Sequence, residues 1–207
     1  MIIPALLILT IANPVAPAAH TVTEYLRALQ NLDYQRMAQY WAADSVSVSS
    51  SGHELPIDRD RMRSMRDFER SEHTTWSFAI QSAEGPNVRA LLTERNDLYD
   101  ALGVGTCTEV VLYRVAHQKI LRMETLRISY SRRPFPEALH EFEQWLAQVG
   151  ASQDHLLMRD GHLLFSESAA VHLTPWLTSW AREHTKTPAP SGHEASPNPS
   201  LQRTNPG

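Results

Sequence analysis

The sequence predicts an α+β fold in which a curved antiparallel sheet packs against helices on one side. Helical patterns dominate residues 21–70, long alternating strands follow over 74–130, and helical patterns return after Pro134. Helices and strands that are segregated along a chain are typical of α+β domains. With 207 residues, of which 42 % are hydrophobic, the chain is long enough to bury one sizeable core.

Two helices are expected first. Thr21 and Glu24 have the spacing of a capping box, and apolar residues follow at helical intervals, which predicts a helix over 21–31. Asp33 can cap a second helix, which we expect to end near Ala43.

A short strand and a third helix complete the first half. Residues 45–50 alternate in the manner of a strand, and Asp58 can open a helix that ends near Arg70. This helix contains five arginines and four acidic residues, a composition that indicates an exposed, salt-bridged face rather than a nucleic-acid-binding stripe. Its narrow apolar stripe consists of Met62, Met65 and Phe68.

Four long strands are expected next. Glycine-containing turns separate them, and the last two form a hairpin around His117 and Gln118. The predicted strands are 74–83, 87–99, 107–116 and 119–130.

A C-terminal helical extension is predicted over residues 133–184. It contains a helix over 138–149, a small hairpin that turns at Asp160-Gly161, and a final helix over 167–184. We expect Pro175 to kink or split this final helix.

The two ends of the chain have compositions of their own. Residues 1–19 are apolar and uncharged, with small residues at Ala16 and Ala18, which predicts a cleaved export signal and a periplasmic or secreted protein. A misplaced start codon or a buried strand, in a cytoplasmic protein, is the alternative.

Residues 185–207 hold five of the 13 prolines and few large apolar groups, so we expect a disordered tail.

Composition excludes several classes of function. The net charge of −4 gives no field that would favour nucleic acid, and the apolar N-terminal run is too short to span a membrane. The single Cys107 excludes an intramolecular disulfide and a cysteine-based zinc site. His140 is followed by Gln144 where a second zinc ligand would stand, so we expect no metal and no cofactor.

Two segments resemble the nuclear transport factor 2-like superfamily, which includes ketosteroid isomerases and SnoaL-like polyketide cyclases. Residues 21–52, TVTEYLRALQNLDYQRMAQYWAADSVSVSSSG, resemble the family's two-helix opening. Residues 110–125, VVLYRVAHQKILRMET, resemble its closing hairpin. The resemblance covers about residues 20–132 and implies a cone-like fold that hosts enzymes, binders and dimerising modules alike.

The resemblance also assigns residues. Tyr25 matches the oxyanion donor of a ketosteroid isomerase, but its base position falls on Ser49 and its second acid on Val111. A hydroxyl does not abstract a carbon-bound proton unaided, and the valine side chain cannot donate a hydrogen bond. The cyclases carry an aspartate near the end of the last strand, where this chain has Leu126-Arg127-Ile128. The implied isomerase and cyclase chemistries therefore lack their usual residues.

The alternation of side chains along the predicted strands indicates which carboxylates can face a pocket. Glu94, Asn96 and Asp100 share one face of a predicted strand, and Asp97 faces the other way. Glu109 shares parity with apolar residues, where a carboxylate is costly unless it is paired or lies near an opening. Glu109 and Glu94 are therefore the candidate catalytic residues, although the remaining acids of this region fit a solvated strand end.

Three functions fit these observations. The first is a small-molecule binder whose apolar cone is lined by Tyr25, Trp41, Trp76 and Tyr113, with Asn96 and the two glutamates as polar groups. The second is an isomerase, dehydratase or cyclase that uses one of these carboxylates as its base. The third is a scaffold that forms a homodimer through the sheet. A raised pKa of Glu109 would favour the enzyme, and a flat apolar sheet without a cavity would favour the scaffold.

Overall fold

The computed structural model describes residues 17–184 and has the predicted α+β architecture. The predicted export signal, apart from its last three residues, and the predicted tail lie outside this part of the chain. The helices are α1 (Pro17–Gln30), α2 (Tyr34–Ala38), α3 (Arg59–Ser71), α4 (Asp97–Ala101), α5 (Phe135–Gln148) and α6 (Glu167–His184), with a 3-10 turn η1 (Ala151–Gln153). The strands are β1 (Trp41–Val48), β2 (Glu54–Pro56), β3 (Thr75–Glu84), β4 (Asn87–Arg95), β5 (Cys107–Ala116), β6 (Lys119–Tyr130), β7 (Met158–Arg159) and β8 (His162–Leu163).

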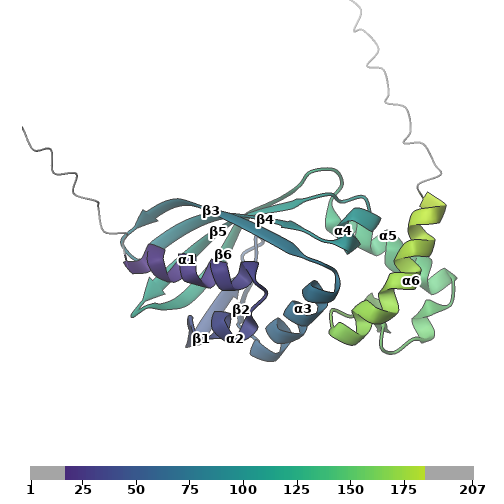
Figure 1. The fold of residues 1–207 in the computed structure, drawn as a ribbon, viewed down its shortest axis with the longest axis horizontal. Helices are drawn as coiled ribbons and strands as arrows, with labels where there is room; N and C mark the ends of the chain where they lie inside the picture. Colours follow the sequence, from purple (N-terminus) through teal and green to yellow (C-terminus); the bar gives the residue numbers. More distant parts are fainter. Residues whose placement is uncertain (1–16, 185–207) are drawn as a thin grey trace, which may run out of the picture.

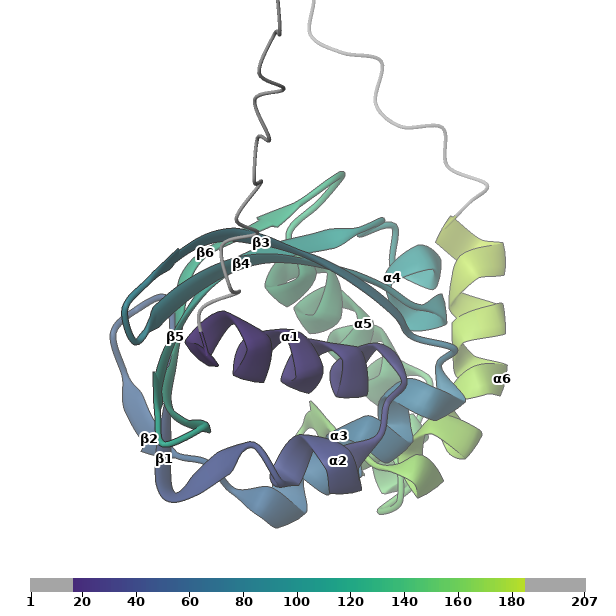
Figure 2. The same cartoon turned by 60° about the vertical axis from the view of Figure 1, so that its left-hand side comes forward.

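Six strands form one curved sheet in the order β2-β1-β6-β5-β4-β3. The pairs are antiparallel except for β1 with β6, which run parallel. The sheet curves around α1, which lies in its concave face, while α2 and α3 lie along the other side of α1 (Figure 2). Helices α5 and α6 pack beyond α4, at the end of the cone away from the start of α1 (Figure 1).

The apolar residues gather in two clusters. One surrounds α1 inside the cone and includes Tyr25, Leu26 and Tyr113, all nearly inaccessible to solvent. The other joins α4, α5 and α6 around Phe142 and Leu173. The C-terminal extension therefore completes a second core against the open end of the cone.

Strand alternation carries carboxylates into the cone. Along β4, burial of Val88, Ala90 and Leu92 alternates with more exposed residues, and Glu94 continues this buried series. In the β4–β5 register, Leu92 faces Glu109 and Glu94 faces Cys107. Glu94 and Glu109 therefore point to the same side of the sheet as diagonal neighbours, at roughly 7–8 Å by general sheet geometry.

Several predicted boundaries are wrong. Helix α1 begins at Pro17, and Thr21 lies inside it with its hydroxyl donating to the Pro17 carbonyl (3.0 Å), so no capping box forms with Glu24. The second helix ends at Ala38 rather than Ala43, because Trp41 already pairs with Ile120 of β6.

The predicted strand 87–99 is also too long. It ends at Arg95, and the Asn96 side chain accepts a hydrogen bond from the Tyr99 backbone N–H (2.7 Å), which caps α4. Asp97 and Asp100 consequently lie exposed on a short helix rather than on alternate faces of a strand.

The C-terminal elements follow the prediction more closely. Helix α5 begins at Phe135, three residues before the expected start. Asp160 and Gly161 turn the small hairpin with positive φ values of 52° and 82°. Helix α6 runs through Pro175 as a single helix, so the proline does not split it. Within residues 17–184, no helix combines the length and the apolar composition needed to cross a membrane.

Gly105 is predicted to be the glycine most sensitive to substitution. Its φ is +78°, and a Cβ there would overlap the Ser131 hydroxyl, which accepts the Thr106 N–H (2.9 Å). We expect Gly105→Ala to lower the free energy of unfolding by about 2–3 kcal/mol, measured by urea denaturation. Gly85→Ala is the matched control, because Gly85 also has positive φ but nothing lies within 4 Å of its Cβ position. Equal losses for the two variants would contradict this account of Gly105.

Candidate functional site

A cavity of about 790 Å³ lies between the two apolar clusters. This size is typical of sites that enclose a small molecule. Its walls come from α1, α3, α4, the strands β3–β6 and the segment that leads into α6. The residues that line it include Tyr25, Arg61, Arg66, Phe68, Glu69, Trp76, Glu94, Asn96, Tyr99, Glu109, Tyr113, Met123, Arg159, Leu163 and Phe165.

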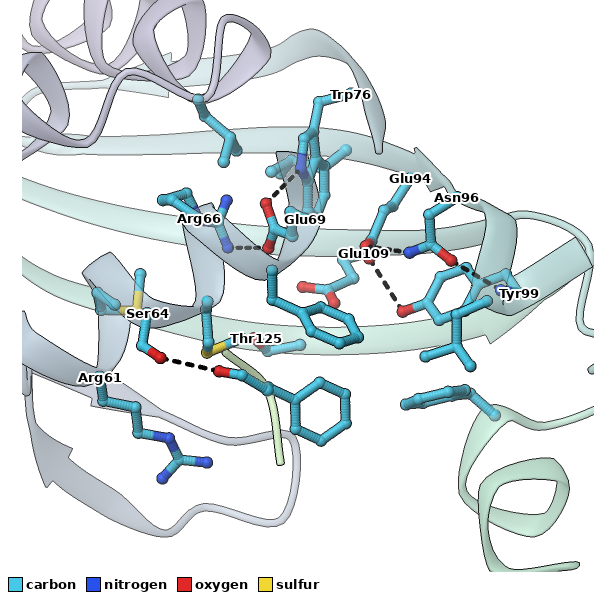
Figure 3. A pocket seen from close by; sticks show the side chains of 18 of the residues that line it. Arg61, Ser64, Arg66, Glu69, Trp76, Glu94, Asn96, Tyr99, Glu109 and Thr125 are labelled. Carbon is cyan, nitrogen blue, oxygen red and sulfur yellow. Dashed lines mark hydrogen bonds and ion pairs between the residues drawn. The ribbon is translucent and has the colours of Figure 1, made fainter. Parts of the chain in front are cut away.

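Glu94 is held by two donors at one end of the cavity (Figure 3). The Asn96 side-chain amide donates to Glu94 Oε1 (2.9 Å) and the Tyr99 hydroxyl donates to Oε2 (3.0 Å). Burial, and next the nearby charge of Glu69, raise the pKa of Glu94 to about 8, although the Tyr99 hydrogen bond opposes the shift. The Glu94 carboxyl is therefore mostly protonated at neutral pH.

Arg66 and Glu69 form an ion pair on α3, with both side chains almost completely buried. The Trp76 indole N–H donates to the second oxygen of Glu69 (3.2 Å), and the Arg66 guanidinium lies 5.9 Å from the Trp76 ring centroid. Two N–H positions of Arg66, Nε and Nη1, are buried and have no hydrogen-bond partner within residues 17–184. These two donors lie on a residue that lines the cavity.

Glu109 extends from β5 into the space between these two groups (Figure 3). Among the described residues, none donates a hydrogen bond to its carboxylate. Burial raises the pKa of Glu109, and the positive charge of Arg66 partly offsets the shift. A buried carboxylate without donors is more basic than one in water.

Two tyrosine hydroxyls complete the polar lining. The ring centroids of Tyr25 and Tyr113 lie 5.9 Å apart, and both side chains are buried. Among the described residues, the Tyr113 hydroxyl has no hydrogen-bond partner. The Tyr25 hydroxyl contacts the Met123 sulfur at 4.0 Å. Burial raises the pKa of Tyr25 to about 12, so its hydroxyl stays protonated and can donate a hydrogen bond to a ligand oxygen.

The cavity brings together most of the residues that the sequence selects. It is lined by six of them, Tyr25, Trp76, Glu94, Asn96, Glu109 and Tyr113. Trp41 is not among the lining residues, because it packs in the core against Tyr25 and Tyr34. Whether the six residues bind a ligand stays a prediction.

Sequence reasoning missed Arg66, Glu69 and Tyr99. The charged helix was interpreted as an exposed face, which is wrong for Arg66 and Glu69 because both are less than 7 % exposed. A signal was present, because residues 66 and 69 continue the helical spacing of Met62 and Met65 and so share their face. Tyr99 was hidden by the predicted strand.

The other acidic residues of this region are not part of the cavity. Asp97 bonds to His73 (2.7 Å) and Asp100 to Arg95 (2.9 Å), and all four side chains are exposed. Residues 17–184 contain no group of three histidine, cysteine, aspartate or glutamate side chains placed to hold a metal ion.

Residues 18–89 match the family model described as a SnoaL-like domain. This match confirms the resemblance to the nuclear transport factor 2-like superfamily and supports a ligand-binding or catalytic domain of that type. The matched segment contains Tyr25, Arg66 and Trp76 but ends before Glu94 and Glu109.

Solved structures of similar proteins were also found. They include an uncharacterized cystatin-fold protein from Novosphingobium aromaticivorans, with 16 % identity, a TM-score of 0.44 and coverage of 54 % of this chain and 98 % of that chain. A protein described as a putative ketosteroid isomerase from Kribbella flavida has 16 % identity, a TM-score of 0.42 and coverage of 59 % and 87 %. A putative SnoaL-like polyketide cyclase from Shewanella denitrificans has 20 % identity, a TM-score of 0.41 and coverage of 54 % and 90 %. No curated protein matches the sequence at a significant level.

The raised pKa of Glu94 predicts how stability depends on pH. The folded state holds this proton up to about pH 8, whereas an unfolded chain releases it near 4.5. Stability should therefore fall as pH rises from about 4.5 to 8. In Glu94→Gln, the amide oxygen can accept from Asn96 and the amide N–H can donate to the Tyr99 hydroxyl, so we expect a shallower fall across this range in urea denaturation. Identical pH slopes in the two proteins would contradict the assignment.

The buried ion pair predicts a large difference between a single and a double variant. Arg66→Met leaves the Glu69 carboxylate buried without its cation, so we expect a loss of about 3–5 kcal/mol in the free energy of unfolding. The double variant Arg66→Met/Glu69→Gln removes both charges and keeps an acceptor for Trp76, so it should recover at least half of this loss. The account fails if the double variant is no more stable than the single one.

Proposed function

We propose that the cavity binds a small, largely apolar molecule and transfers protons to and from it. The observation that carries the proposal is the presence of two carboxyl groups with different surroundings within one cavity. Glu94 has two hydrogen-bond donors and a pKa of about 8, whereas Glu109 has no donor. Groups whose surroundings separate their protonation states are suited to act as acid and base.

Glu109 is the proposed base. Its carboxylate can take a proton from a carbon next to a carbonyl group. The electron pair of the broken C–H bond then forms a C=C bond to the carbonyl carbon, and the π electron pair of the carbonyl group moves to its oxygen. Arg66 and Tyr113 line the cavity and carry buried donors without a hydrogen-bond partner among the described residues, and they are the proposed donors for that oxygen. Glu69 already neutralises the positive charge of Arg66. These donors are therefore better suited to a ketone oxygen, which is neutral before the reaction, than to an anionic group.

Glu94 is the proposed acid. It is mostly protonated at neutral pH, and it is a diagonal neighbour of Glu109 on the same side of the sheet. It can therefore return a proton to a second position of the same molecule, which amounts to an isomerisation, or protonate a leaving hydroxyl, which amounts to a dehydration.

The other two readings of the sequence are less well supported. A raised pKa of Glu109 favours the enzyme over a passive binder, and the presence of a cavity favours both of these over a scaffold. Leu126 and Ile128 are 41 % and 38 % exposed on β6, so dimerisation through the sheet stays a proposal. Export also stays a proposal, since it concerns residues outside the described part of the chain.

Hydrogen exchange at carbon tests the proposed reaction. The protein is incubated in D2O with a panel of small cyclic and aryl ketones, and loss of the proton next to the carbonyl is followed by 1H NMR. We expect exchange above the buffer rate for at least one ketone, and Glu109→Gln should slow it by about 10²- to 10⁴-fold. Glu84→Gln, at an exposed position outside the cavity, is the control. Exchange that is equally fast in Glu109→Gln would refute Glu109 as the base.

A further inference from the structure

Two arginines lie at the opening of the cavity. Arg61 and Arg159 line it and are exposed, whereas the other lining residues are buried or half-buried. A residue that lines a cavity and is also exposed lies where the cavity meets solvent. Within residues 17–184, neither guanidinium forms an ion pair with an acidic side chain.

Regular secondary structure holds the backbone of both arginines in place. Arg61 lies in the first turn of α3, where its backbone N–H donates to the capping carboxylate of Asp58 (2.9 Å). Arg159 lies on β7, in the hairpin of the C-terminal extension. Beyond this hairpin, the Phe165 carbonyl accepts a hydrogen bond from the Ser64 hydroxyl (3.0 Å) and the Phe165 ring packs on Phe68 at 5.1 Å. The extension is thereby attached to α3 beside the cavity.

The charges inside the cavity differ from those at its opening. Arg66 is paired with Glu69, Glu94 is mostly protonated, and Glu109 is the remaining acid, so the interior holds no uncompensated positive charge. At the opening, two guanidinium groups have no acidic partner in the described part of the chain. An anionic group is therefore favoured at the opening and disfavoured inside, whereas a cationic ligand would have to pass both arginines.

We infer that the ligand is an elongated apolar molecule with one anionic group, held at the opening by Arg61 and Arg159. Its apolar body lies between Phe68, Phe165 and Trp76, and its opposite end lies beside Glu109. This inference rests on the proposed function, because it assumes a ligand in the cavity. It assigns a specificity role to Arg159, which belongs to the C-terminal extension and lies outside the family match.

Two fluorescent probes with one scaffold test the inference. Anilinonaphthalene sulfonate carries an anionic group, and N-phenylnaphthylamine is the same aromatic amine without it. Both are titrated into the full chain at neutral pH and low salt, and the fluorescence change is fitted to one site. We expect the sulfonate to bind at least about tenfold more tightly, with a preference that weakens as salt is added.

Variants at the opening locate this preference. Arg61→Gln and Arg159→Gln should each weaken sulfonate binding by about three- to tenfold and leave binding of the neutral probe unchanged. Arg61→Lys and Arg159→Lys, which keep the charge, should restore most of the preference. Arg114→Gln, which removes an exposed arginine outside the cavity, is the matched control and should change neither affinity.

The possible failures can be told apart. If the neutral probe binds as tightly as the sulfonate, or if the Gln variants keep the full preference, the inference is overturned while a ligand-binding cavity stands. If neither probe binds, the proposed function fails as well, because an apolar cavity of this size should accept both.

Discussion

The arrangement of the site follows from an imbalance of buried charge. Inside the cone, among the described residues, the single buried guanidinium of Arg66 faces the carboxyl groups of Glu69, Glu94 and Glu109. Three ionised carboxylates with one cation would be very costly at this depth. The imbalance is resolved by different protonation: Glu69 takes the cation, Glu94 keeps its proton between Asn96 and Tyr99, and Glu109 is left without a partner. An unpaired carboxylate at this depth costs stability, so its presence is better explained by a functional role than by a structural one.

The fold creates this site at the boundary between its two apolar clusters. The sheet and α1 supply Tyr25 and Tyr113 from the cluster inside the cone, whereas Phe68, Leu98 and Leu163 belong to the cluster of the C-terminal helices. The cavity is therefore enclosed only when the extension is in place. Residues of α3 contribute to both sides, which explains why this one helix carries the ion pair, an exposed arginine and an aromatic contact to the segment before α6.

The sequence predicted those parts of the site that depend on strand parity. Glu94 and Glu109 could be placed on inward faces because a strand alternates strictly, and β4 and β5 are long enough to show the pattern. It could not show that the Asn96 side chain would cap α4, since an asparagine within an apparent strand gives a weak helix signal. The burial of Arg66 and Glu69 was equally hidden, because charge-rich helices usually face solvent and only the tertiary packing against Trp76 overrides that expectation. The fold and the inward position of these two carboxylates were therefore predictable from the sequence. The neighbouring residues that determine their protonation were not.

The protonation states of the buried glutamates are the central claim, and NMR of the carboxyl carbons measures them directly. The chain would be labelled with 13C at the glutamate side-chain carboxyl and titrated between about pH 3 and 10, with the Glu94→Gln, Glu109→Gln and Glu69→Gln variants used to assign the signals. The account predicts a Glu94 midpoint near 8 and a Glu109 midpoint above the ordinary glutamate value of 4.5. If every glutamate of the folded protein titrated near 4.5, the cavity would hold only ionised carboxylates and the proposed division into acid and base would be contradicted.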